Sequence, residues 1–345
     1  MRVWLDALTS KQGRLAACLA LHLKDLGYET FITCREYECT RYTIELYGLK
    51  PTVVGEHGGG TKLGKLLADA NRVYALARLV GEASPKALVA YPNPSAARVA
   101  FGLGIPYIAL NDTPHAEAAN RLSLPLCSVL VAPEALRGEF ENFLSKNARV
   151  FYYDGVDEIL WVKMFKPTGS TLKELKLERR RYVVVRPEEF KAAYYSWGGW
   201  GWLELCDVLK KHGLTTVVLP RYEEQRKEAL KRGFLAPTTC VDGLDLVHHS
   251  LAVVTGGGTM AREAALLGIP SYYTFPLNLK VSAYVQSLGF PLKRWDGSPS
   301  ELAEEVLSLD ESQVEENVKK AREMVVRLKT PDECVLQALE WIGET

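Results

Sequence analysis

Three consecutive glycines, Gly256, Gly257 and Gly258, follow an apolar run in the second half of the chain. Because glycine has no side chain, the backbone N–H groups of such a turn can come close to a phosphate. A helix is expected to start near Thr259, and its dipole adds partial positive charge at the same point. These residues therefore predict an anion-binding turn.

Glu263 lies one turn into that predicted helix. Its carboxylate is close enough to the glycine turn to accept hydrogen bonds from sugar hydroxyl groups. The alternative is a flexible turn followed by an exposed carboxylate, but three glycines in succession seldom serve packing alone. Glu263 and the glycines are therefore candidate binding residues for a ligand with phosphate and sugar groups.

A second polar group, which contains Asn111, Asp112 and His115, follows another apolar run. A carboxylate and an imidazole this close together at the end of a strand can deprotonate a hydroxyl group. Alternatively, Asp112 or Thr113 caps a helix that starts with Pro114. Both roles can coexist, so Asp112 and His115 are candidate catalytic residues and Asn111 is a candidate contact for an acceptor.

Arg186 ends a further apolar run, residues 182–186. A guanidinium group is a good bidentate partner for a diphosphate. Glu188 and Glu189 follow, and they either orient Arg186 or are ordinary carboxylates in the first turn of a helix. The aromatic residues of the next segment, 194–202, can stack on a base or a sugar, or can simply pack in the interior.

Residues 57–65 read H-G-G-G-T-K-L-G-K and contain most of the phosphate-binding loop of nucleoside triphosphatases. That loop needs Ser or Thr after its last lysine to bind magnesium, and Leu66 stands there. We therefore expect no nucleoside triphosphate at this loop. It is expected instead to hold the acceptor, or a phosphate group on it, with Lys62 or Lys65 adding charge. The candidate contacts are His57, Gly58, Gly59 and Gly60.

The first expected strand-to-helix turn, residues 9–14, reads T-S-K-Q-G-R. Gln12 and Gly13 of this turn are candidate contacts on the acceptor side. Glutamine cannot act as a general base. A base must therefore come from elsewhere, with Asp112 or His115 first in line, or the chemistry differs.

These motifs lie between apolar runs and helical stretches that alternate along the chain. Residues 2–8 and 29–34 read as strands, and residues 13–27 between them carry apolar residues at helical spacing. Such alternation, with continuously apolar strands, predicts parallel sheets covered on both faces. Ligands bind such sheets beyond the carboxyl ends of the strands. The motifs described above are expected at those ends.

The alternation breaks near residues 161–180 and then resumes, which suggests a boundary between two domains. We therefore predict the α/β class, with two doubly wound Rossmann-like domains that face each other across a cleft. The expected parts are an N-terminal acceptor-side domain (1–160), a linker (161–180), a C-terminal donor-side domain (181–325) and a C-terminal helix (326–345) that can cross back to the first domain.

Composition excludes several classes of protein. The 42 basic and 42 acidic residues give zero net charge, so the overall charge does not indicate a nucleic-acid partner. No apolar run reaches the roughly 18 residues that a transmembrane helix needs, and the start of the chain lacks a signal peptide. We therefore expect a cytoplasmic protein. The seven cysteines are scattered without a C-x-x-C pair, so no metal site is expected.

Residues 255–270, T-G-G-G-T-M-A-R-E-A-A-L-L-G-I-P, resemble the donor-site segment of GT-B glycosyltransferases. The likeness is greatest to the lipid-II-forming N-acetylglucosaminyltransferase, and the non-hydrolysing UDP-N-acetylglucosamine 2-epimerases share the segment. In those families the glycine turn holds the diphosphate, and a glutamate spaced as Glu263 is from Gly268 binds the ribose. Residues 240–254 resemble the segment that follows the base-binding loop, which implies Val241 and Leu244 as neighbours of the base.

Residues 91–133 resemble the end of the acceptor domain of the same transferase. The chain as a whole resembles an uncharacterised prokaryotic, archaeal-type domain-of-unknown-function family within the GT-B superfamily. The phrases N-D-T-P-H (111–115), V-R-P-E-E (185–189) and G-G-G-T-M-A-R-E-A-A-L-L-G (256–268) carry that resemblance. Residues 9–14 depart from the transferases, which have a histidine in this turn, and from the 2-epimerases, which have an arginine.

The resemblance implies a glycosyltransferase that moves a sugar from a nucleotide-diphosphate donor, UDP-linked, to a hydroxyl acceptor. Two alternatives stay open: a non-hydrolysing nucleotide-sugar 2-epimerase, and a nucleotide-sugar binding protein without catalysis. The nucleotide sugar would be a substrate, and no tightly bound cofactor is expected, because GT-B enzymes generally need no bound metal. A lipid-linked acceptor would bring the protein to the membrane surface as a peripheral protein.

Overall fold

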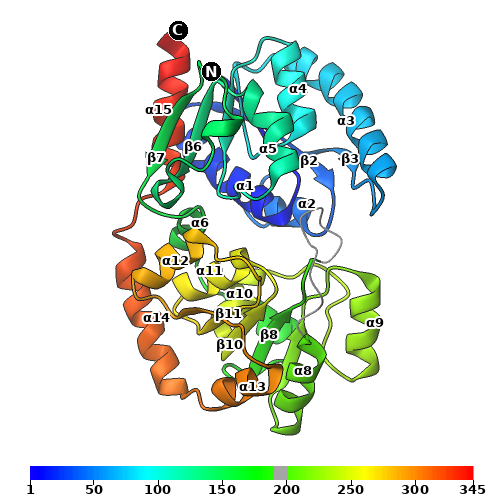
Figure 1. Cartoon of the computed structure of the whole chain (residues 1–345), viewed down its shortest axis with the longest axis vertical. Helices are drawn as coiled ribbons and strands as arrows, with labels where there is room; N and C mark the ends of the chain where they lie inside the picture. The colour runs from blue at the N-terminus through cyan, green and yellow to red at the C-terminus, as the bar shows by residue number, and fades with distance from the viewer. Residues whose placement is uncertain (190–200, 345) are drawn as a thin grey trace. The chain divides into compact units, whose positions relative to one another are not determined.

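The computed structural model describes residues 1–189 and 201–344, and Figure 1 shows it coloured along the chain. Residues 194–200 of the aromatic segment lie outside the described residues. The β-strands of the described chain form two sheets, one in each of two compact units.

Unit 1 comprises Met1–Trp161 and the chain from Lys329 onward, and unit 2 comprises Val162–Leu328. Residues 162–180, expected above to be linker, thus belong to unit 2. Helix α15 (Pro331–Glu344), at the end of the chain, belongs to unit 1, where it contacts strands β6 and β7.

The sheet of unit 1 is seven-stranded and parallel, in the order β3-β2-β1-β4-β5-β6-β7. Its central strands β4, β5 and β6 are continuously apolar and buried, as expected for a doubly wound sheet whose faces are covered by helices. The strands are β1 (Arg2–Ala7), β2 (Glu29–Glu36), β3 (Thr52–Glu56), β4 (Ala87–Ala90), β5 (Tyr107–Leu110), β6 (Val129–Pro133) and β7 (Arg149–Tyr153).

Three helices of unit 1, α1, α3 and α4, start at a side-chain cap. The Thr9 side chain accepts a hydrogen bond from the backbone N–H of Gln12 at the start of α1, and Asn93 does the same for α4. The helices are α1 (Ser10–Asp25), α2 (Thr40–Glu45), α3 (Lys62–Ala83), α4 (Pro94–Gly102), α5 (Glu117–Ser123) and α6 (Glu158–Met164), whose last residues belong to unit 2.

One alternative weighed for this unit is wrong. Asp112 or Thr113 was considered as the cap of a helix that starts with Pro114, but α5 begins at Glu117 and no side chain caps it. Asp112 instead forms an ion pair with Lys11 and accepts a hydrogen bond from the Thr113 hydroxyl. The capping alternative is thereby removed for Asp112.

The sheet of unit 2 is five-stranded and parallel, in the order β12-β11-β10-β8-β9. Together the two sheets confirm the predicted class, α/β with two doubly wound Rossmann-like domains. The strands are β8 (Tyr182–Arg186), β9 (Thr215–Val218), β10 (Ala252–Thr255), β11 (Ser271–Tyr273) and β12 (Leu292–Arg294).

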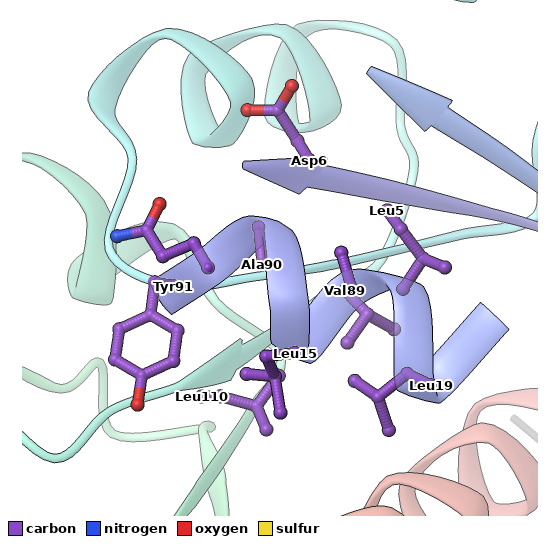
Figure 2. A pocket seen from close by; sticks show the side chains of 10 residues that line it. Leu5, Asp6, Leu15, Leu19, Val89, Ala90, Tyr91 and Leu110 are labelled. Atoms are coloured by element: carbon purple, nitrogen blue, oxygen red, sulfur yellow. The ribbon is translucent and has the colours of Figure 1, made fainter. Parts of the chain in front are cut away.

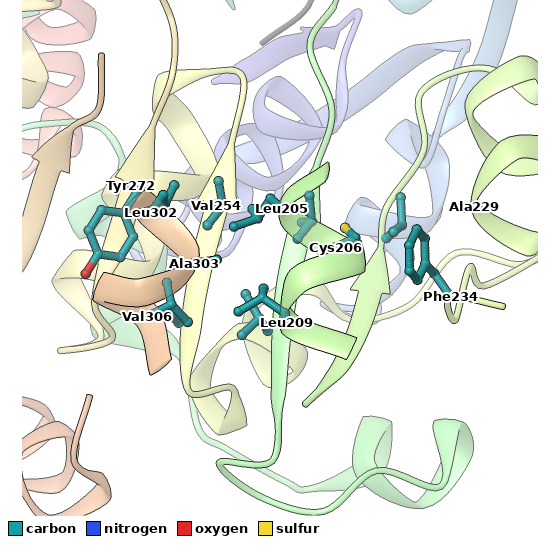
Figure 3. Packing of buried hydrophobic residues seen from close by; sticks show 14 of the residues in the cluster. Leu205, Cys206, Leu209, Ala229, Phe234, Val254, Tyr272, Leu302, Ala303 and Val306 are labelled. Carbon is teal, nitrogen blue, oxygen red and sulfur yellow. The ribbon is translucent and has the colours of Figure 1, made fainter. Parts of the chain in front are cut away.

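Figure 3 shows how one face of this sheet is covered: strand residues such as Val254 pack against Leu205 and Leu209 of α8 and against Leu302 and Val306 of α13. These side chains are completely or almost completely buried. The helices of unit 2 are α7 (Ser170–Leu175), α8 (Trp202–Lys211), α9 (Glu223–Lys231), α10 (Gly243–His249), α11 (Gly258–Leu266), α12 (Lys280–Ser287), α13 (Pro299–Leu307) and α14 (Glu311–Val325).

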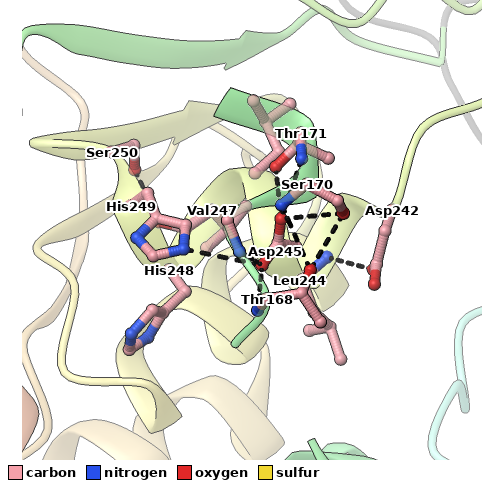
Figure 4. A network of polar contacts seen from close by, with 12 residues as sticks. Thr168, Ser170, Thr171, Asp242, Leu244, Asp245, Val247, His248, His249 and Ser250 are labelled. Atoms are coloured by element: carbon pink, nitrogen blue, oxygen red, sulfur yellow. Dashed lines mark hydrogen bonds and ion pairs between the residues drawn. The ribbon is translucent and has the colours of Figure 1, made fainter. Parts of the chain in front are cut away.

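A buried carboxylate attaches the start of α7 to α10 within unit 2 (Figure 4). Asp245 accepts hydrogen bonds from the backbone N–H groups of Thr168 (2.8 Å), Gly169 (2.9 Å) and Thr171 (3.0 Å). Burial alone would raise the pKa of Asp245, but these bonds and one from the Thr171 hydroxyl hold it well below its usual value. The Asp245 carboxylate therefore holds the start of α7 against α10.

Each sheet has one topological switch point, where successive connections leave in opposite directions. In unit 1 it lies between β1 and β4, and in unit 2 it lies between β8 and β10. Ligands of open α/β sheets bind beyond the carboxyl ends of the strands at such points. The two switch points therefore define where a site is expected in each unit.

Candidate functional site

The glycine turn lies at the switch point of unit 2. Thr255 at the end of β10 is in register with Arg186 at the end of β8, and the Gly256 N–H donates to the Arg186 carbonyl at 2.9 Å. Helix α11 then starts at Gly258, with Gly257 as an N-cap that has no side chain. Free N–H groups at a helix start attract anions. The end of β8, the turn and the start of α11 thus lie together at one edge of the sheet, where an anion is expected.

The three positions of the turn hold glycine for different physical reasons. A Cβ at Gly256 would lie 2.5 Å from Cγ of Glu188, and one at Gly258 would lie 2.6 Å from Nη1 of Arg262. Those two positions are therefore small because neighbouring protein atoms approach them. At Gly257 the nearest such atom is Nη2 of Arg221, 3.8 Å away, so this position leaves room beside an arginine. The expectation that the triplet serves ligand binding more than packing fits Gly257 best.

Two arginines that the sequence analysis missed stand next to this turn. Arg221 follows β9 and forms an ion pair with Glu189 at 3.2 Å. Arg262 is buried in α11, and its Nη1 donates to the Ser282 hydroxyl at 3.2 Å. A strand-end position was the available signal for Arg221. The sequence offered no such signal for Arg262, because an arginine within a helical stretch is normally expected on a solvent-exposed face of the helix.

The other donor-side candidates occupy the same part of unit 2. Glu263 is almost completely buried in α11, and Thr259, one position into that helix, is half-buried. Val241 is half-buried in the loop before α10. Leu244 is 1% exposed and packs in the interior of the unit.

Unit 1 has a different group at its switch point. The ammonium group of Lys11, just after β1, forms ion pairs with Asp112, with Asp157 at 2.9 Å and with Glu158 at 3.7 Å. It also lies 5.0 Å from the centre of the Tyr91 ring. All three carboxylates are almost completely buried. We call these residues, together with Tyr153, the Lys11 cluster.

Two tyrosines complete the Lys11 cluster. The hydroxyl groups of Tyr91, after β4, and Tyr153, at the end of β7, both donate to the Asp157 carboxylate, the latter at 2.6 Å. Burial raises the pKa of Tyr153 well above its usual value, so it remains a donor. The members lie at the carboxyl ends of four strands, β1, β4, β5 and β7, or just beyond them. Sequence reasoning found Asp112 but missed Asp157 and Glu158.

The neighbours of Asp112 shape its loop. The Asn111 side chain donates to Oδ1 of Asn120 at 2.9 Å and accepts from the Thr113 N–H at 2.9 Å. Asn120 in turn donates to the Thr113 and Pro114 carbonyls. Asn111 therefore stabilises the loop that carries Asp112. His115 lies half-buried in the turn that follows.

Gln12 and Gly13 also have structural contacts. The Gln12 side chain accepts a hydrogen bond from the Leu8 N–H at 2.7 Å, which closes the turn before α1. A Cβ at Gly13 would lie 2.7 Å from the Thr43 hydroxyl, so glycine permits α1 to pack on α2. Gln12 also lines a small, mostly apolar cavity.

That cavity lies between α1 and strands β1, β4 and β5, as Figure 2 shows. Asp6 contributes its carboxylate, which is bound by Arg72 at 2.7 Å and by Thr33 and Asn93. Because this carboxylate is fully paired within the protein, the cavity is part of the core. Its lining residues are Leu5, Asp6, Gln12, Leu15, Ala16, Leu19, Val89, Ala90, Tyr91 and Leu110.

His57, in the loop before α3, contacts aromatic and basic residues at the end of β2. His57 stacks on Tyr37 with ring centres 4.4 Å apart, and Arg35 lies 4.8 Å from the same tyrosine ring. Burial, then the nearby Arg35 and Lys65, lower the pKa of His57 below its usual value. His57 is thus favoured as a neutral imidazole. A mainly neutral side chain is better suited to contact an acceptor than to neutralise a phosphate.

The glycines of that loop serve its turn. A Cβ at Gly58 would lie 2.3 Å from the Gly64 carbonyl oxygen, and Gly59 has a φ of +74°, which favours glycine. At Gly60 a Cβ would meet no atom within 4 Å. The loop ends at Thr61, which caps α3.

Two searches of the described residues gave no result. No three His, Cys, Asp or Glu side chains among them are grouped as a metal site would require. Likewise, none of the described helices combines the length and the apolar character that a membrane crossing requires.

Solved structures of other proteins share this fold. S. aureus MnaA, whose structure was solved with UDP, has a TM-score of 0.74 at 11% identity, over 99% of this chain and 97% of that chain. The UDP-GlcNAc 2-epimerase from Methanocaldococcus jannaschii, in complex with UDP-GlcNAc and UDP, has a TM-score of 0.66 at 13% identity, over 99% of this chain and 100% of that chain. Spinosyn forosaminyltransferase SpnP has a TM-score of 0.62 at 13% identity, over 99% of both chains. The chain has the GT-B fold of glycosyltransferases and 2-epimerases.

Residues 1–324 match the model of a family described as "Protein of unknown function (DUF354)", and the chain belongs to that family. A relative from Methanocaldococcus jannaschii, "Uncharacterized protein MJ0665", is 30% identical over 286 residues, which are 80% of this chain and 82% of the relative. The archaeal-type family expected from the sequence is confirmed.

Proposed function

We propose that the protein binds a nucleoside-diphosphate sugar, UDP-linked, and transfers its sugar to a hydroxyl acceptor. The observation that carries this proposal is the anion-binding edge of unit 2: Arg186, the glycine turn and the start of α11 meet at the switch point. This is the place where a doubly wound sheet binds a diphosphate. The solved neighbours with UDP or a UDP-sugar in their titles support the same ligand class.

In this proposal the diphosphate is both the binding handle and the leaving group. The N–H groups after Gly257 and the guanidinium of Arg186 would stabilise the charge that develops on it when the bond to the sugar breaks. Arg221, beside Gly257, is placed to add a second cation. Glu263, five positions after Gly258 on α11, would accept hydrogen bonds from the ribose.

The proton of the acceptor needs a base, and we assign it to unit 1. Asp112 is paired with the Lys11 ammonium group, and a nearby cation favours the ionised form of a carboxylate. Ionised Asp112 can accept the acceptor's hydroxyl proton while the new bond from that oxygen to the sugar carbon forms and the bond to the diphosphate breaks. His115, three positions further on, is the alternative base. A lipid-linked alcohol is one kind of hydroxyl acceptor to which the sugar would be transferred.

A second function is favoured by one specific observation. Epimerisation at the second carbon of a nucleotide sugar needs several carboxylates and a base around that carbon. The Lys11 cluster supplies three carboxylates around one ammonium group. A nucleotide-sugar 2-epimerase is therefore our second candidate.

A ligand panel followed by product analysis tests the proposal. The purified protein is first screened by thermal shift against UDP, other nucleotides and their sugars. A ligand present at about a hundred times its dissociation constant should stabilise the fold by about 2.7 kcal/mol. The bound sugar nucleotide is then incubated with and without alcohol acceptors. UDP release that depends on the acceptor supports transfer, whereas a changed sugar without an acceptor supports epimerisation. A panel without any sugar-nucleotide response would overturn both.

A further inference from the structure

The side chain of Gln225 joins two loops at the carboxyl edge of the unit 2 sheet. Gln225 lies in the first turn of α9 and is almost completely buried. Its Oε1 accepts a hydrogen bond from the Arg221 N–H at 2.8 Å, and its Nε2 donates to the Glu188 carbonyl at 3.1 Å. The first contact is local, but the second reaches a residue 37 positions earlier in the chain. Gln225 therefore fixes the loop after β9 to the loop after β8.

The start of α9 accounts for only one of these two contacts. A glutamine or glutamate in the first turn of a helix commonly accepts a hydrogen bond from the backbone just before the helix, and Gln225 does so with Arg221. An oxygen is sufficient for that contact, so a glutamate would serve as well. The amide nitrogen of Gln225 serves the Glu188 carbonyl, a contact that helix capping does not require.

The guanidinium group of Arg221 is bound to the same loop after β8. Its Nε donates to the Pro187 carbonyl at 3.3 Å, and its Nη1 pairs with the Glu189 carboxylate at 3.2 Å. Its Nη2 lies 3.8 Å from the position of a Cβ at Gly257. The side chain is 18% exposed, so a ligand at the glycine turn can reach it. These contacts set the direction of the guanidinium group beside the turn.

The loop after β8 is itself in close contact with the glycine turn. A Cβ at Gly256 would lie 2.6 Å from Cα and 2.8 Å from the backbone nitrogen of Glu188. The Glu188 carbonyl that Gln225 holds is thus part of the backbone that packs on the turn. Gly256, Glu188, Gln225, Arg221 and Gly257 therefore form a ring of contacts, in which Gln225 links the turn's packing to the position of a cation.

We propose that Gln225 is a positioning residue that makes the site select a nucleoside diphosphate over a monophosphate, because it fixes Arg221 where a second phosphate group would lie. This inference rests on the proposed function. The backbone N–H groups of a helix start can hold one phosphate group, and a guanidinium group in a fixed position adds a bidentate contact to a second. If the side chain had to be ordered at the moment of binding, part of that contact would be lost.

Calorimetric titration of UDP and of UMP tests the inference. Gln225→Met removes both hydrogen bonds with little change in side-chain volume. We expect it to weaken UDP binding about tenfold and UMP binding less than about twofold, because only the diphosphate uses Arg221. Gln225→Glu keeps an acceptor for the Arg221 N–H and loses the donor to Glu188. It is a second variant that should also lose selectivity for UDP, should Gln225→Met fail to fold.

A double variant separates positioning from a general structural role. If Gln225 acts through Arg221, Gln225→Met should cause no further loss of UDP affinity in a protein that already carries Arg221→Met. Melting temperatures of all variants report on stability. The matched control is Gln313→Met, at an exposed glutamine of α14, which should bind UDP and UMP like the unmodified protein.

The outcomes distinguish this inference from the proposed function. Three results overturn the inference alone, provided that the unmodified protein binds UDP: UDP affinity that Gln225→Met leaves unaltered, equal losses for UDP and UMP, or losses that add in the double variant. No UDP binding by the unmodified protein overturns the proposed function and this inference together.

Discussion

Both sheets are parallel and have one switch point each, but the charged groups at their carboxyl edges differ. In unit 1 the loops gather carboxylates, Asp112, Asp157 and Glu158, around the single ammonium group of Lys11. In unit 2 the corresponding loops bring arginines to a glycine turn. A doubly wound sheet only provides loops at one edge, and the residues on those loops decide the chemistry.

The contrast also concerns how the charges are held. The three carboxylates in unit 1 are buried and are paired with Lys11 and two tyrosine hydroxyls, an arrangement that suits proton transfer. The edge of unit 2 offers backbone N–H groups that no side chain caps, which suits the binding of an anion. We therefore expect variants in unit 1 to change turnover and variants in unit 2 to change ligand affinity.

The largest expected effect is on turnover. Asp112→Asn should reduce kcat by about 10²- to 10⁴-fold, because the amide cannot accept the proton. Donor affinity should change little, since Asp112 belongs to unit 1. Steady-state kinetics with calorimetric titration of UDP-sugar separates the two quantities. His115→Ala serves as the comparison, and full activity in both variants would exclude this loop as the source of the base.

The next effect concerns affinity. Glu263→Ala should weaken binding of the nucleotide sugar by about 1.5–3 kcal/mol, the range for a hydrogen bond to a charged group. Isothermal titration measures the change directly. Glu204→Ala, at a carboxylate in the first turn of α8, is a control that should leave affinity unaltered. Equal affinity for Glu263→Ala and the unmodified protein would remove the ribose assignment.

Two substitutions within the glycine turn sharpen the comparison. Gly256→Ala should destabilise the protein by about 1–3 kcal/mol, because its Cβ would overlap Glu188, including the Glu188 backbone. Gly257→Ala has room, so its effect on stability should be smaller, about 0.5–1 kcal/mol, because alanine is a poorer N-cap of α11 than glycine. Urea denaturation measures both. If the two variants were equally stable, the close approach at Gly256 would not be a constraint.

The smallest effect is a dependence of stability on pH from the two histidines of α10 (Figure 4). Burial, then the neighbouring His249, lowers the pKa of His248 from 6.5 to about 4. The unfolded chain therefore binds a proton that the folded protein does not, and stability should fall as the pH drops from 6.5 to 4. Asp245, whose pKa is lowered in the folded protein, adds to this fall only at the acid end of the window, where the unfolded chain begins to bind a proton at this carboxylate.

Melting temperatures at several pH values measure this effect. His248→Gln should flatten the fall between the two pH values, because glutamine does not titrate. His212→Gln is the matched control, since His212 is exposed at the end of α8 and its replacement should leave the slope as it was. A slope that His248→Gln does not change would assign the acid sensitivity to other groups.

Much of the fold could be predicted from the sequence, because strand periodicity and helix caps are local. The apolar run before Gly256 became β10, and the parallel sheets followed from strand–helix alternation. The pairing of Asp112 with Lys11 could not be predicted, because that lysine lies 101 positions earlier in the chain. Local sequence carries no information about such a partner.

The candidate site was predictable to the extent that its residues sit in conspicuous loops. Arg186 and the glycines stand at strand ends with unusual composition, and Asp112 follows an apolar run. Asp157 and Glu158 lie in an ordinary acidic stretch, and only the meeting of four loops makes them part of the Lys11 cluster. Gly256 and Gly258 are conspicuous in the sequence for another reason. Close contacts with Glu188 and Arg262 explain why these positions hold glycine, without a ligand.

The central claim is that unit 2 binds a nucleoside diphosphate at Arg186, the glycine turn and α11. Isothermal titration of UDP into the unmodified protein, Glu263→Ala and Asp112→Asn tests it most directly. The account predicts binding that Glu263→Ala weakens by roughly ten- to a hundredfold and that Asp112→Asn leaves intact. No binding of UDP, or binding that Asp112→Asn abolishes and Glu263→Ala preserves, would contradict it.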